Sequence, residues 1–352
     1  MATDRRSLLQ GLAALLLPLP AFGVTAEPRF IASRRTADGH RATVFDIQGD
    51  ILASHDLPGR GHGAAVSPTG QAVLFARRPG RLALAVSARD GSEIARIRPP
   101  ADRHFYGHGF FSEDGRRLYA TENDFGAARG VLGIYDAAND FTRIGEIDTG
   151  GTGPHETLLL PDGAHAVIAN GGIETHPDWP RRKLNLPAMQ PSLTTIELAT
   201  GQVVHRAEPP PELRSLSIRH VTLAGNDVWF ACQDERPDIG PRPLLGVYPP
   251  GGTIKWIADS ADPDLRGYLG SIAASRDGTR IAASSPRGGR AVIWSAASGR
   301  RIETRAIADV CGAVPARDGF LFSDGQGRIW RDGLLAAQLP CAWDNHIYPI
   351  RA

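Results

Sequence analysis

From residue 28 onward the chain repeats one arrangement of short apolar runs separated by turn signals. No segment keeps the 3.6-residue period of an amphipathic helix. One repeat unit has apolar runs at residues 62–67, 71–76, 81–86 and 93–97. Runs of this length, bounded by residues such as Pro68 and Gly70, predict β-strands. We therefore expect a chain built almost entirely of strands.

The same unit recurs along the whole chain. Further units open at residues 108, 155, 220, 270 and 312, at intervals of roughly 45 residues. The two ends supply one more: residues 345–350 resemble an opening run, and three runs after residue 28 resemble the second, third and fourth. Four strands at this period are typical of a β-propeller. We predict an all-β fold, a seven-bladed β-propeller closed by pairing the N- and C-terminal strands in one blade.

A β-sandwich or two small barrels is the alternative, but neither explains why the C-terminal run matches a unit opening. Composition agrees with many turns, because 40 Gly and 27 Pro in 352 residues exclude a helical bundle, and they lack the strict period of collagen. A hydrophobic fraction of 42% excludes disorder as the dominant state. A net charge of +1 gives no global basic field for nucleic acid.

Residues 1–26 have the features of an export signal. Arg5 and Arg6 precede an apolar run at residues 12–22, and residues 24–26 offer a small-residue cleavage step. The apolar run is too short to span a membrane. Paired arginines favour the twin-arginine pathway over an ordinary secretory signal. We expect a periplasmic protein without a transmembrane anchor after cleavage, and a single propeller domain over residues 27–352.

Histidine opens five of the seven predicted units, although the chain has only 11 histidines. In a blade the chain runs outward from the central channel, so the opening segments and the loops between second and third strands share one face. Neutral imidazole suits first-row transition metals. We predict a metal site, for iron or copper, among the openings at His108, His155, His220 and His346. Bonds of about 2 Å allow only two or three neighbouring blades to share one ion.

An architectural role for these histidines is the alternative. WD-repeat propellers carry a Gly-His pair before the innermost strand, and residues 61–62 and 107–108 look like that pair. The later openings do not. The candidate ligand-binding residues on the same face are Glu122, Asn123, Glu156, His176 and Arg287. The insertion at residues 173–191 is long enough to cover the channel mouth.

Motifs of established catalytic families are missing from the sequence. It contains no Walker loop, no HExxH and no GxGxxG before a helix, so catalytic residues stay unknown. The three cysteines form no CxxC motif. Cys311 and Cys341 could form a disulfide in an oxidising compartment, or stay reduced.

Several longer motifs resemble a known family in their order along the chain. They are residues 107–111 (GHGFF), 121–123 (TEN), 153–156 (GPHE), 169–178 (ANGGIETHPD), 183–186 (KLNL), 189–193 (MQPSL), 217–220 (SIRH), 285–289 (SPRGG) and 344–346 (DNH). Over nearly the whole mature chain they resemble the bacterial family called domain of unknown function 1513. The resemblance implies a propeller similar to the quinoprotein amine dehydrogenase β-chain-like and YVTN-type superfamily, in an exported protein.

Genes of that family often lie beside those for imelysin-type proteins and a dihaem oxidoreductase. The resemblance therefore implies these proteins as partners and a part in periplasmic iron handling, and it implies no reaction. Our leading hypothesis is a ligand- or metal-binding accessory protein with its site at the His-rich channel mouth. The alternatives are a metal-dependent oxidoreductase or hydrolase that uses the same site, and a structural interaction platform.

Overall fold

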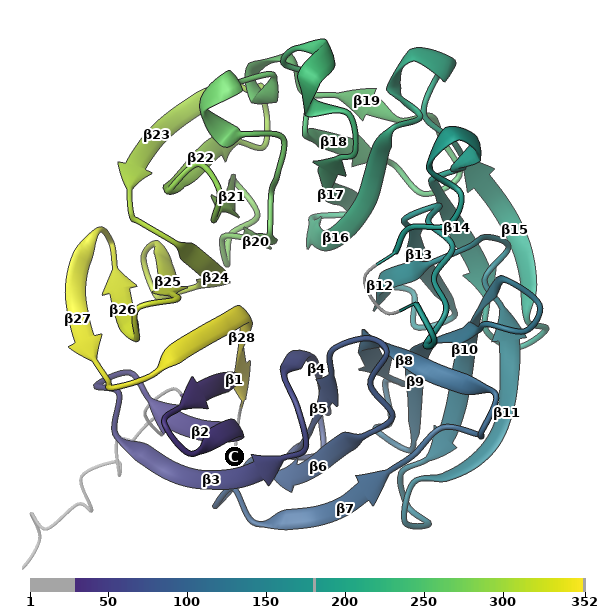
Figure 1. Cartoon of the computed structure of the whole chain (residues 1–352), viewed down its shortest axis with the longest axis vertical. Coiled ribbons are helices and arrows are strands. Elements are labelled where there is room, and N and C mark those ends of the chain that lie inside the picture. The colour runs from purple at the N-terminus through teal and green to yellow at the C-terminus, as the bar shows by residue number, and fades with distance from the viewer. Residues whose placement is uncertain (1–28, 180–181, 351–352) are drawn as a thin grey trace, which may run out of the picture.

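A computed structural model describes residues 29–179 and 182–350, and these residues form seven four-stranded antiparallel sheets arranged in a ring around a central channel (Figure 1). We number these sheets as blades from the one that holds the chain ends. Blade 1 consists of β28 (Ala342–Ile350), β1 (Arg29–Thr36), β2 (Gly39–Asp46) and β3 (Ile51–Leu57). The all-β, seven-bladed prediction is confirmed. The predicted export signal lies outside the described residues.

Blades 2 to 4 follow in chain order, each with its innermost strand first. Blade 2 consists of β4 (Gly61–Val66), β5 (Gln71–Ala76), β6 (Ala83–Ser87) and β7 (Glu93–Ile97). Blade 3 consists of β8 (Arg103–Phe111), β9 (Arg117–Asp124), β10 (Arg129–Asp136) and β11 (Thr142–Asp148). Blade 4 consists of β12 (Pro154–Leu159), β13 (His165–Asn170), β14 (Ser192–Glu197) and β15 (Gln202–Ala207).

Blades 5 to 7 complete the ring in the same manner. Blade 5 consists of β16 (Leu216–Ala224), β17 (Asp227–Asp234), β18 (Leu245–Tyr248) and β19 (Lys255–Trp256). Blade 6 consists of β20 (Ser271–Ala274), β21 (Arg280–Ser285), β22 (Arg290–Ser295) and β23 (Arg301–Ala306). Blade 7 consists of β24 (Val310–Pro315), β25 (Phe320–Asp324), β26 (Arg328–Arg331) and β27 (Leu334–Gln338).

Five short 3-10 helices lie in the loops of the described chain. They are η1 (Leu186–Ala188), η2 (Pro211–Leu213), η3 (Pro237–Ile239), η4 (Ala258–Ser260) and η5 (Pro263–Leu265). Four of them carry proline in their first turn, where the missing N–H costs no hydrogen bond. No helix among the described residues is long and apolar enough to cross a membrane.

The ring closes through strand pairing between the two ends of the chain. β28 pairs antiparallel with β1 over the register from Arg29 with Ile350 to Arg35 with Ala342. The C-terminal strand is thus the innermost strand of blade 1, and the N-terminal segment supplies the other three, as the sequence predicted. Because the two ends of the chain pair within one blade, the ring closes without a free sheet edge where they meet.

Apolar side chains fill the space between adjacent blades. Phe30, Phe45 and Trp343 of blade 1 pack with Leu321 and Ile329 of blade 7 in one buried cluster. The rings of Phe45 and Trp343 have centroids 4.7 Å apart. The seam is therefore held by a packed core as well as by strand pairing. The outermost strands face solvent, which explains the exposed side chains along β3, β7 and β23.

Candidate metal centre in the channel

The five opening histidines converge inside the channel, on the innermost strands of five consecutive blades. His346, His62, His108, His155 and His220 lie on β28, β4, β8, β12 and β16. Each of them is at most 7% exposed. The sequence placed them at the openings of the innermost strands, around the channel mouth. They lie within these strands, and they line the channel itself.

A β-bulge lies at each of the five histidines and aims its side chain at the channel axis. The register of the innermost strand against the second strand shifts at residues 61–64, 105–109, 154–156 and 218–220, and β28 shifts against β1 next to His346. A bulge leaves an extra residue out of the ladder and turns its neighbours. Of the two blades without a channel histidine, blade 6 has no shift between β20 and β21, whereas blade 7 has one at residues 310–313.

Glycines make room for two of the rings. A Cβ atom on Gly63 would lie 2.5 Å from Nδ1 of His108, and one on Gly107 would lie 2.6 Å from Cδ2 of His62. The glycine beside each histidine therefore makes space for the other histidine. The centroids of these two rings are 4.8 Å apart.

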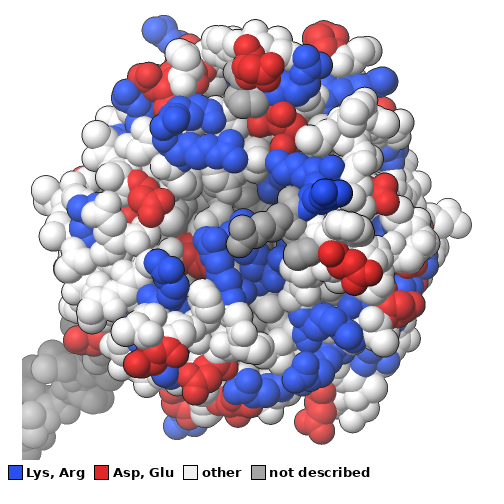
Figure 2. Space-filling view, viewed as in Figure 1, with Lys and Arg blue, Asp and Glu red and all other residues white. Residues whose placement is uncertain are grey.

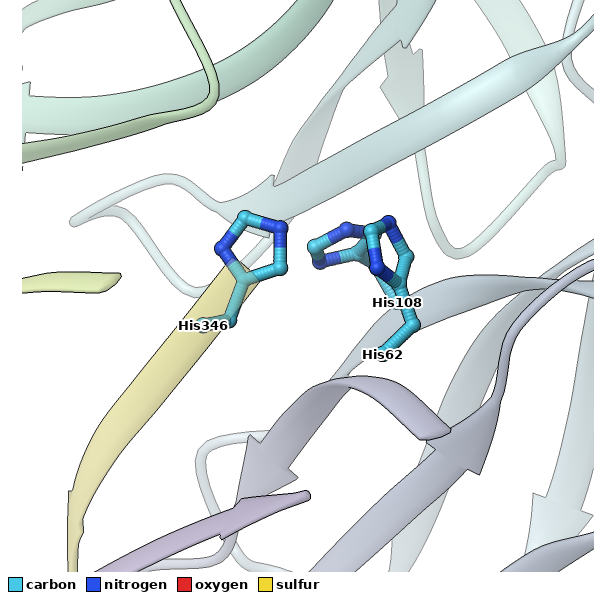
Figure 3. A group of neighbouring side chains, drawn as sticks. All are labelled: His62, His108 and His346. Atoms are coloured by element: carbon cyan, nitrogen blue, oxygen red, sulfur yellow. The ribbon is translucent and has the colours of Figure 1, made fainter. Parts of the chain in front are cut away.

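The histidines form two groups of three that share His108. The first group, from blades 1 to 3, is His62, His108 and His346 (Figure 3), and the second, from blades 3 to 5, is His108, His155 and His220. Within each group one ligand atom per residue can be chosen so that all lie within 4.8 Å of one another. Nε2 of His62 also lies 3.5 Å from Nε2 of His155. Each group thus draws its ligands from three neighbouring blades, the largest number that metal–nitrogen bond lengths allow for one ion.

Glu156 and Tyr348 orient the shared part of the cluster. Nδ1 of His220 lies 3.0 Å from one Glu156 oxygen, and Nδ1 of His108 lies 3.2 Å from the other. The Tyr348 hydroxyl lies 3.1 Å from Nδ1 of His108. With Nδ1 occupied, Nε2 of His108 and Nε2 of His220 are buried and have no hydrogen-bond partner among the described residues. Nδ1 of His62 and Nε2 of His346 are in the same situation.

The buried position sets the charge state of the cluster. Burial, followed by repulsion between the rings, lowers the pKa of His62 and of His155 well below the usual value. Burial also lowers the pKa of His220 and His346, although Glu156 opposes the shift in both. Burial raises the pKa of Glu156, but the charges and hydrogen bonds of His108 and His220 outweigh it and hold that pKa well below its usual range. Near neutral pH Glu156 is therefore ionised, and His62, His155, His220 and His346 are neutral, the form of imidazole that binds metals.

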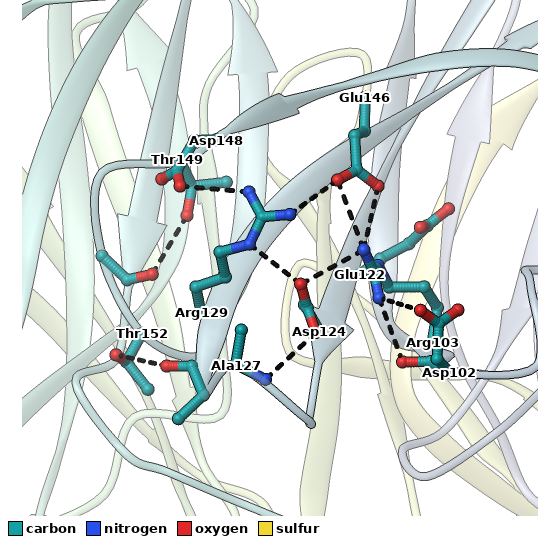
Figure 4. A network of polar contacts seen from close by, with 12 residues as sticks. Asp102, Arg103, Glu122, Asp124, Ala127, Arg129, Glu146, Asp148, Thr149 and Thr152 are labelled. Atoms are coloured by element: carbon teal, nitrogen blue, oxygen red, sulfur yellow. Dashed lines mark hydrogen bonds and ion pairs between the residues drawn. The ribbon is translucent and has the colours of Figure 1, made fainter.

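Glu122 does not join the histidines. It is fully buried in blade 3, where it accepts a hydrogen bond from the Tyr135 hydroxyl and pairs with Arg143 at 3.1 Å. Burial raises the pKa of Glu122, and Arg143 limits that shift. Arg143 also pairs with Glu146 at 2.7 Å. Figure 4 shows the ion pairs that Glu146 makes in turn with Arg103 and Arg129 along blade 3. The side chain of Glu122 thus points toward the outer strands of blade 3 and away from the channel.

Three other candidates lie on the mouth face, outside the histidine cluster. Asn123 donates to the carbonyl of Thr175 at 2.9 Å, and His176 packs edge-on against Phe125. The insertion from blade 4 thus rests on blade 3. Arg287 lies over the ring of Tyr268, with 5.0 Å from the guanidinium carbon to the ring centroid. The described residues contain no disulfide, and all three cysteines are free.

Two residues of the cluster were missing from the predicted site. His62 was grouped with Gly61 as an architectural Gly-His pair, yet it completes the first group. Tyr348 carries no signal in the sequence apart from its position two residues after His346. Such alternation on a strand puts both side chains on one face, which could have identified it.

Comparisons with known proteins support the fold. A family model described as "Protein of unknown function (DUF1513)" matches residues 55–350. No curated protein matches the chain.

Solved structures with the same fold are similar to this chain. Hydrazine synthase of Kuenenia stuttgartiensis has a TM-score of 0.62, with 14% identity and 89% of each chain covered. The β-propeller domain of Cps50 (Swd1) from Myceliophteria thermophila has a TM-score of 0.62 at 12% identity, covering 86% of this chain and 93% of that one. BamB from Moraxella catarrhalis has a TM-score of 0.51 at 14% identity, covering 90% of this chain and 87% of that one. At these identities the likeness shows the fold alone.

Proposed function

This chain belongs to the family of proteins of unknown function called DUF1513, and we propose that its channel histidines bind a first-row divalent transition metal. The observation that carries the proposal is the role of Glu156. It occupies Nδ1 of His108 and Nδ1 of His220, so that the unpartnered Nε2 atoms are left as ligands. A carboxylate behind a ligating histidine fixes the tautomer and raises the basicity of the ligand.

The orphaned nitrogens are a second support. A buried polar atom without a partner costs about 1–3 kcal/mol, and four such atoms lie in this one cluster. An architectural role would have each histidine hydrogen-bonded within its own blade. Here His220 instead bonds to Glu156 of the neighbouring blade, and His108 bonds to Glu156 and to Tyr348 of blade 1.

The donor set narrows the choice of metal. Imidazole nitrogens suit Fe²⁺, Cu²⁺, Ni²⁺ and Zn²⁺, whereas Ca²⁺ and Mg²⁺ require oxygen ligands. Iron bound here would be ferrous. We further propose that the protein is exported through the segment at residues 1–26 and serves in periplasmic iron handling, which the family resemblance implies.

Metal analysis of three variants tests the proposal. Apo protein is loaded with Fe²⁺ under anaerobic conditions, or with Cu²⁺ or Zn²⁺, and desalted, and bound metal is measured by mass spectrometry. We expect stoichiometric binding in the wild type and its loss in His108→Gln, because His108 belongs to both groups. His346→Gln removes only the first group and His155→Gln only the second, so these variants identify the group that binds.

His165→Gln is the matched control, because His165 is a partly exposed histidine that pairs with Asp162 on a turn of blade 4. Thermal unfolding of each variant verifies that it is folded. Metal binding that survives in His108→Gln, or wild-type protein that retains no metal, would contradict the proposal and favour a structural platform. Fractionation of the native host, with the twin arginines Arg5 and Arg6 changed to lysine, tests export separately.

A further inference from the structure

Unpaired arginines lie beside the histidine cluster at the mouth of the channel. Arg77 and Arg78 occupy the loop between β5 and β6 of blade 2, and both are half-buried. Neither side chain has a hydrogen bond or an acidic partner among the described residues. Figure 2 shows Lys and Arg gathered around the central hollow of this face.

Three other cations of this face, Arg60, Arg219 and Lys183, differ because each has a carboxylate. Arg60 pairs with buried Asp344, with 2.6 Å from Nε to a carboxylate oxygen. Arg219 and Lys183 share Glu235. Burial lowers the pKa of Arg78 to about 10, and the charge of Arg219 adds to this effect. Arg78 therefore remains charged at neutral pH while lacking a counter-ion.

The arginines also line a cavity. Arg60, Arg77, Arg78, Arg81 and Arg98 surround a space of about 380 Å³, and no acidic residue lines it. Guanidinium groups bind carboxylate and phosphate oxygens through two parallel hydrogen bonds. Asp344 already occupies the guanidinium group of Arg60, and Arg81 donates to the carbonyls of Pro99 and Pro100. The cavity is large enough for a small polyanion on the arginines that remain.

The backbone N–H of Arg77 donates to the carbonyl of Arg60 at 2.8 Å, two residues before His62, so the arginine loop lies next to the first histidine of the chain that lines the channel. The charges of the arginines also act on the histidines. Burial lowers the pKa of His62 and of His346 most, and the charge of Arg77 contributes to both shifts. Arg78 contributes in the same way at His155. A divalent ion on neutral imidazoles adds two positive charges beneath unpaired guanidinium groups, and the cluster itself contains one carboxylate, Glu156. Repulsion in this buried setting opposes metal binding unless an anion enters as well.

We propose that Arg77 and Arg78 hold a small carboxylate- or phosphate-bearing anion in the cavity beside the histidine cluster, and that this anion and the metal bind together. The inference rests on the proposed metal site, because it names the second component that this site takes. Binding energies that are coupled act in both directions, so the anion strengthens metal binding by the same factor by which the metal strengthens anion binding.

Titration of the apo protein with Co²⁺, followed by its visible absorption, tests the proposal. The probes are succinate for a carboxylate and sulfate for a tetrahedral oxyanion, each compared with chloride at equal ionic strength. Both probes bind Co²⁺ weakly in solution. We expect one of them to raise the affinity for Co²⁺ at least 10-fold in the wild type, and the probe that does so identifies the class of anion.

In the double variant Arg77→Gln, Arg78→Gln we expect this increase to disappear. Arg116→Gln is the matched control, because Arg116 is an exposed arginine in the turn between β8 and β9 on the opposite face, and it should retain the full increase. Calorimetry of each anion with metal-free protein completes the set. The altered side chains lie in a partly exposed loop, and thermal unfolding confirms that the variant is folded.

The two hypotheses fail in different ways. Tight Co²⁺ binding that neither anion changes would overturn the joint site and leave the metal site standing. Anion binding that depends on Arg77 and Arg78, in a protein that binds no Co²⁺, would overturn the metal site and with it the joint binding. An increase in Co²⁺ affinity that persists in the double variant would also overturn the inference, since the anion would then bind elsewhere.

Discussion

Glu156 of blade 4 holds His220 of blade 5 through a hydrogen bond of 3.0 Å between its Oε2 atom and Nδ1 of the ring. The same oxygen accepts a hydrogen bond from the backbone N–H of Val221 at 3.2 Å. One carboxylate therefore fixes both the backbone and the imidazole of the neighbouring blade. Glu156 thus helps to orient His108 and His220, two of the three histidines of the second group.

Replacing Glu156 with Gln should weaken metal binding about 10- to 100-fold, the usual effect of removing a carboxylate behind a metal-ligating histidine. The amide keeps the shape of the side chain and loses its charge. Co²⁺ titration measures the change, and Glu113→Gln, in an exposed turn of blade 3, is the control. Unchanged affinity in Glu156→Gln would mean that the second group does not bind the metal.

Alanine at Gly63 should destabilise the protein by about 1–3 kcal/mol, the range for an added methyl group in a tightly packed site. The new Cβ atom would lie 2.5 Å from Nδ1 of His108 and 2.7 Å from the carbonyl oxygen of Gly107. Urea unfolding of the apo protein measures this cost. Gly126→Ala is the control, because its Cβ atom would meet nothing closer than 3.9 Å. Equal stability of the two variants would show that the ring of His108 lies elsewhere.

Acid should destabilise the metal-free protein between pH 6.5 and about pH 5. The folded-state pKa values of four channel histidines are lowered, namely those of His62, His155, His220 and His346. In this pH range the unfolded chain therefore binds protons on these histidines that the folded chain does not bind. The free energy of unfolding thus rises with pH in this window, by up to about 1.4 kcal/mol per pH unit for each histidine. Above pH 6.5 the contribution is constant, because the histidines are neutral in both states.

Urea unfolding at several pH values measures this slope. The lowered pKa of Glu156 acts in the same direction, but only below its unfolded value near 4.5, where the unfolded chain protonates this carboxyl group before the folded chain does. In His155→Gln the slope of the free energy of unfolding between pH 6.5 and 5 should decrease by about the contribution of one histidine. A slope that does not change in this variant would show that His155 titrates normally.

Glu122→Gln should lower the stability by about 1–3 kcal/mol and leave metal affinity unchanged, because Glu122 pairs with Arg143 and Tyr135 within blade 3. The sequence alone gave Glu122 a place among the ligand-binding candidates. Thermal unfolding and Co²⁺ titration of one preparation distinguish a role of Glu122 in stability from a role in metal binding. Glu156→Gln, which should weaken metal binding, serves as the comparison.

The fold was predictable because each blade repeats the same strands and turns, and because the run after Asn345 matches a blade opening while the first three runs match the rest of a blade. The grouping of the opening histidines was predictable for the same reason. Their exact environment was not. The inward turn of each side chain comes from bulges, whose register depends on pairing with a partner strand that periodicity does not specify.

The assignment of Glu122 illustrates the same limit. Residues 121–123 look like a polar loop in the sequence, yet they form the end of β9, and strand alternation turns Glu122 away from the channel. Its buried charge is tolerated because Arg143, about twenty positions later in the chain, lies beside it. Such a pairing between distant residues becomes visible only in three dimensions.

The closure of blade 1 by β28 also has a consequence for the order of events during synthesis. His346 is carried by β28, whereas His62 and His108 are made some 240 to 280 residues earlier. The first group is therefore complete only after β28 has been made and has paired with β1. Loading of that group would thus report that the ring has closed.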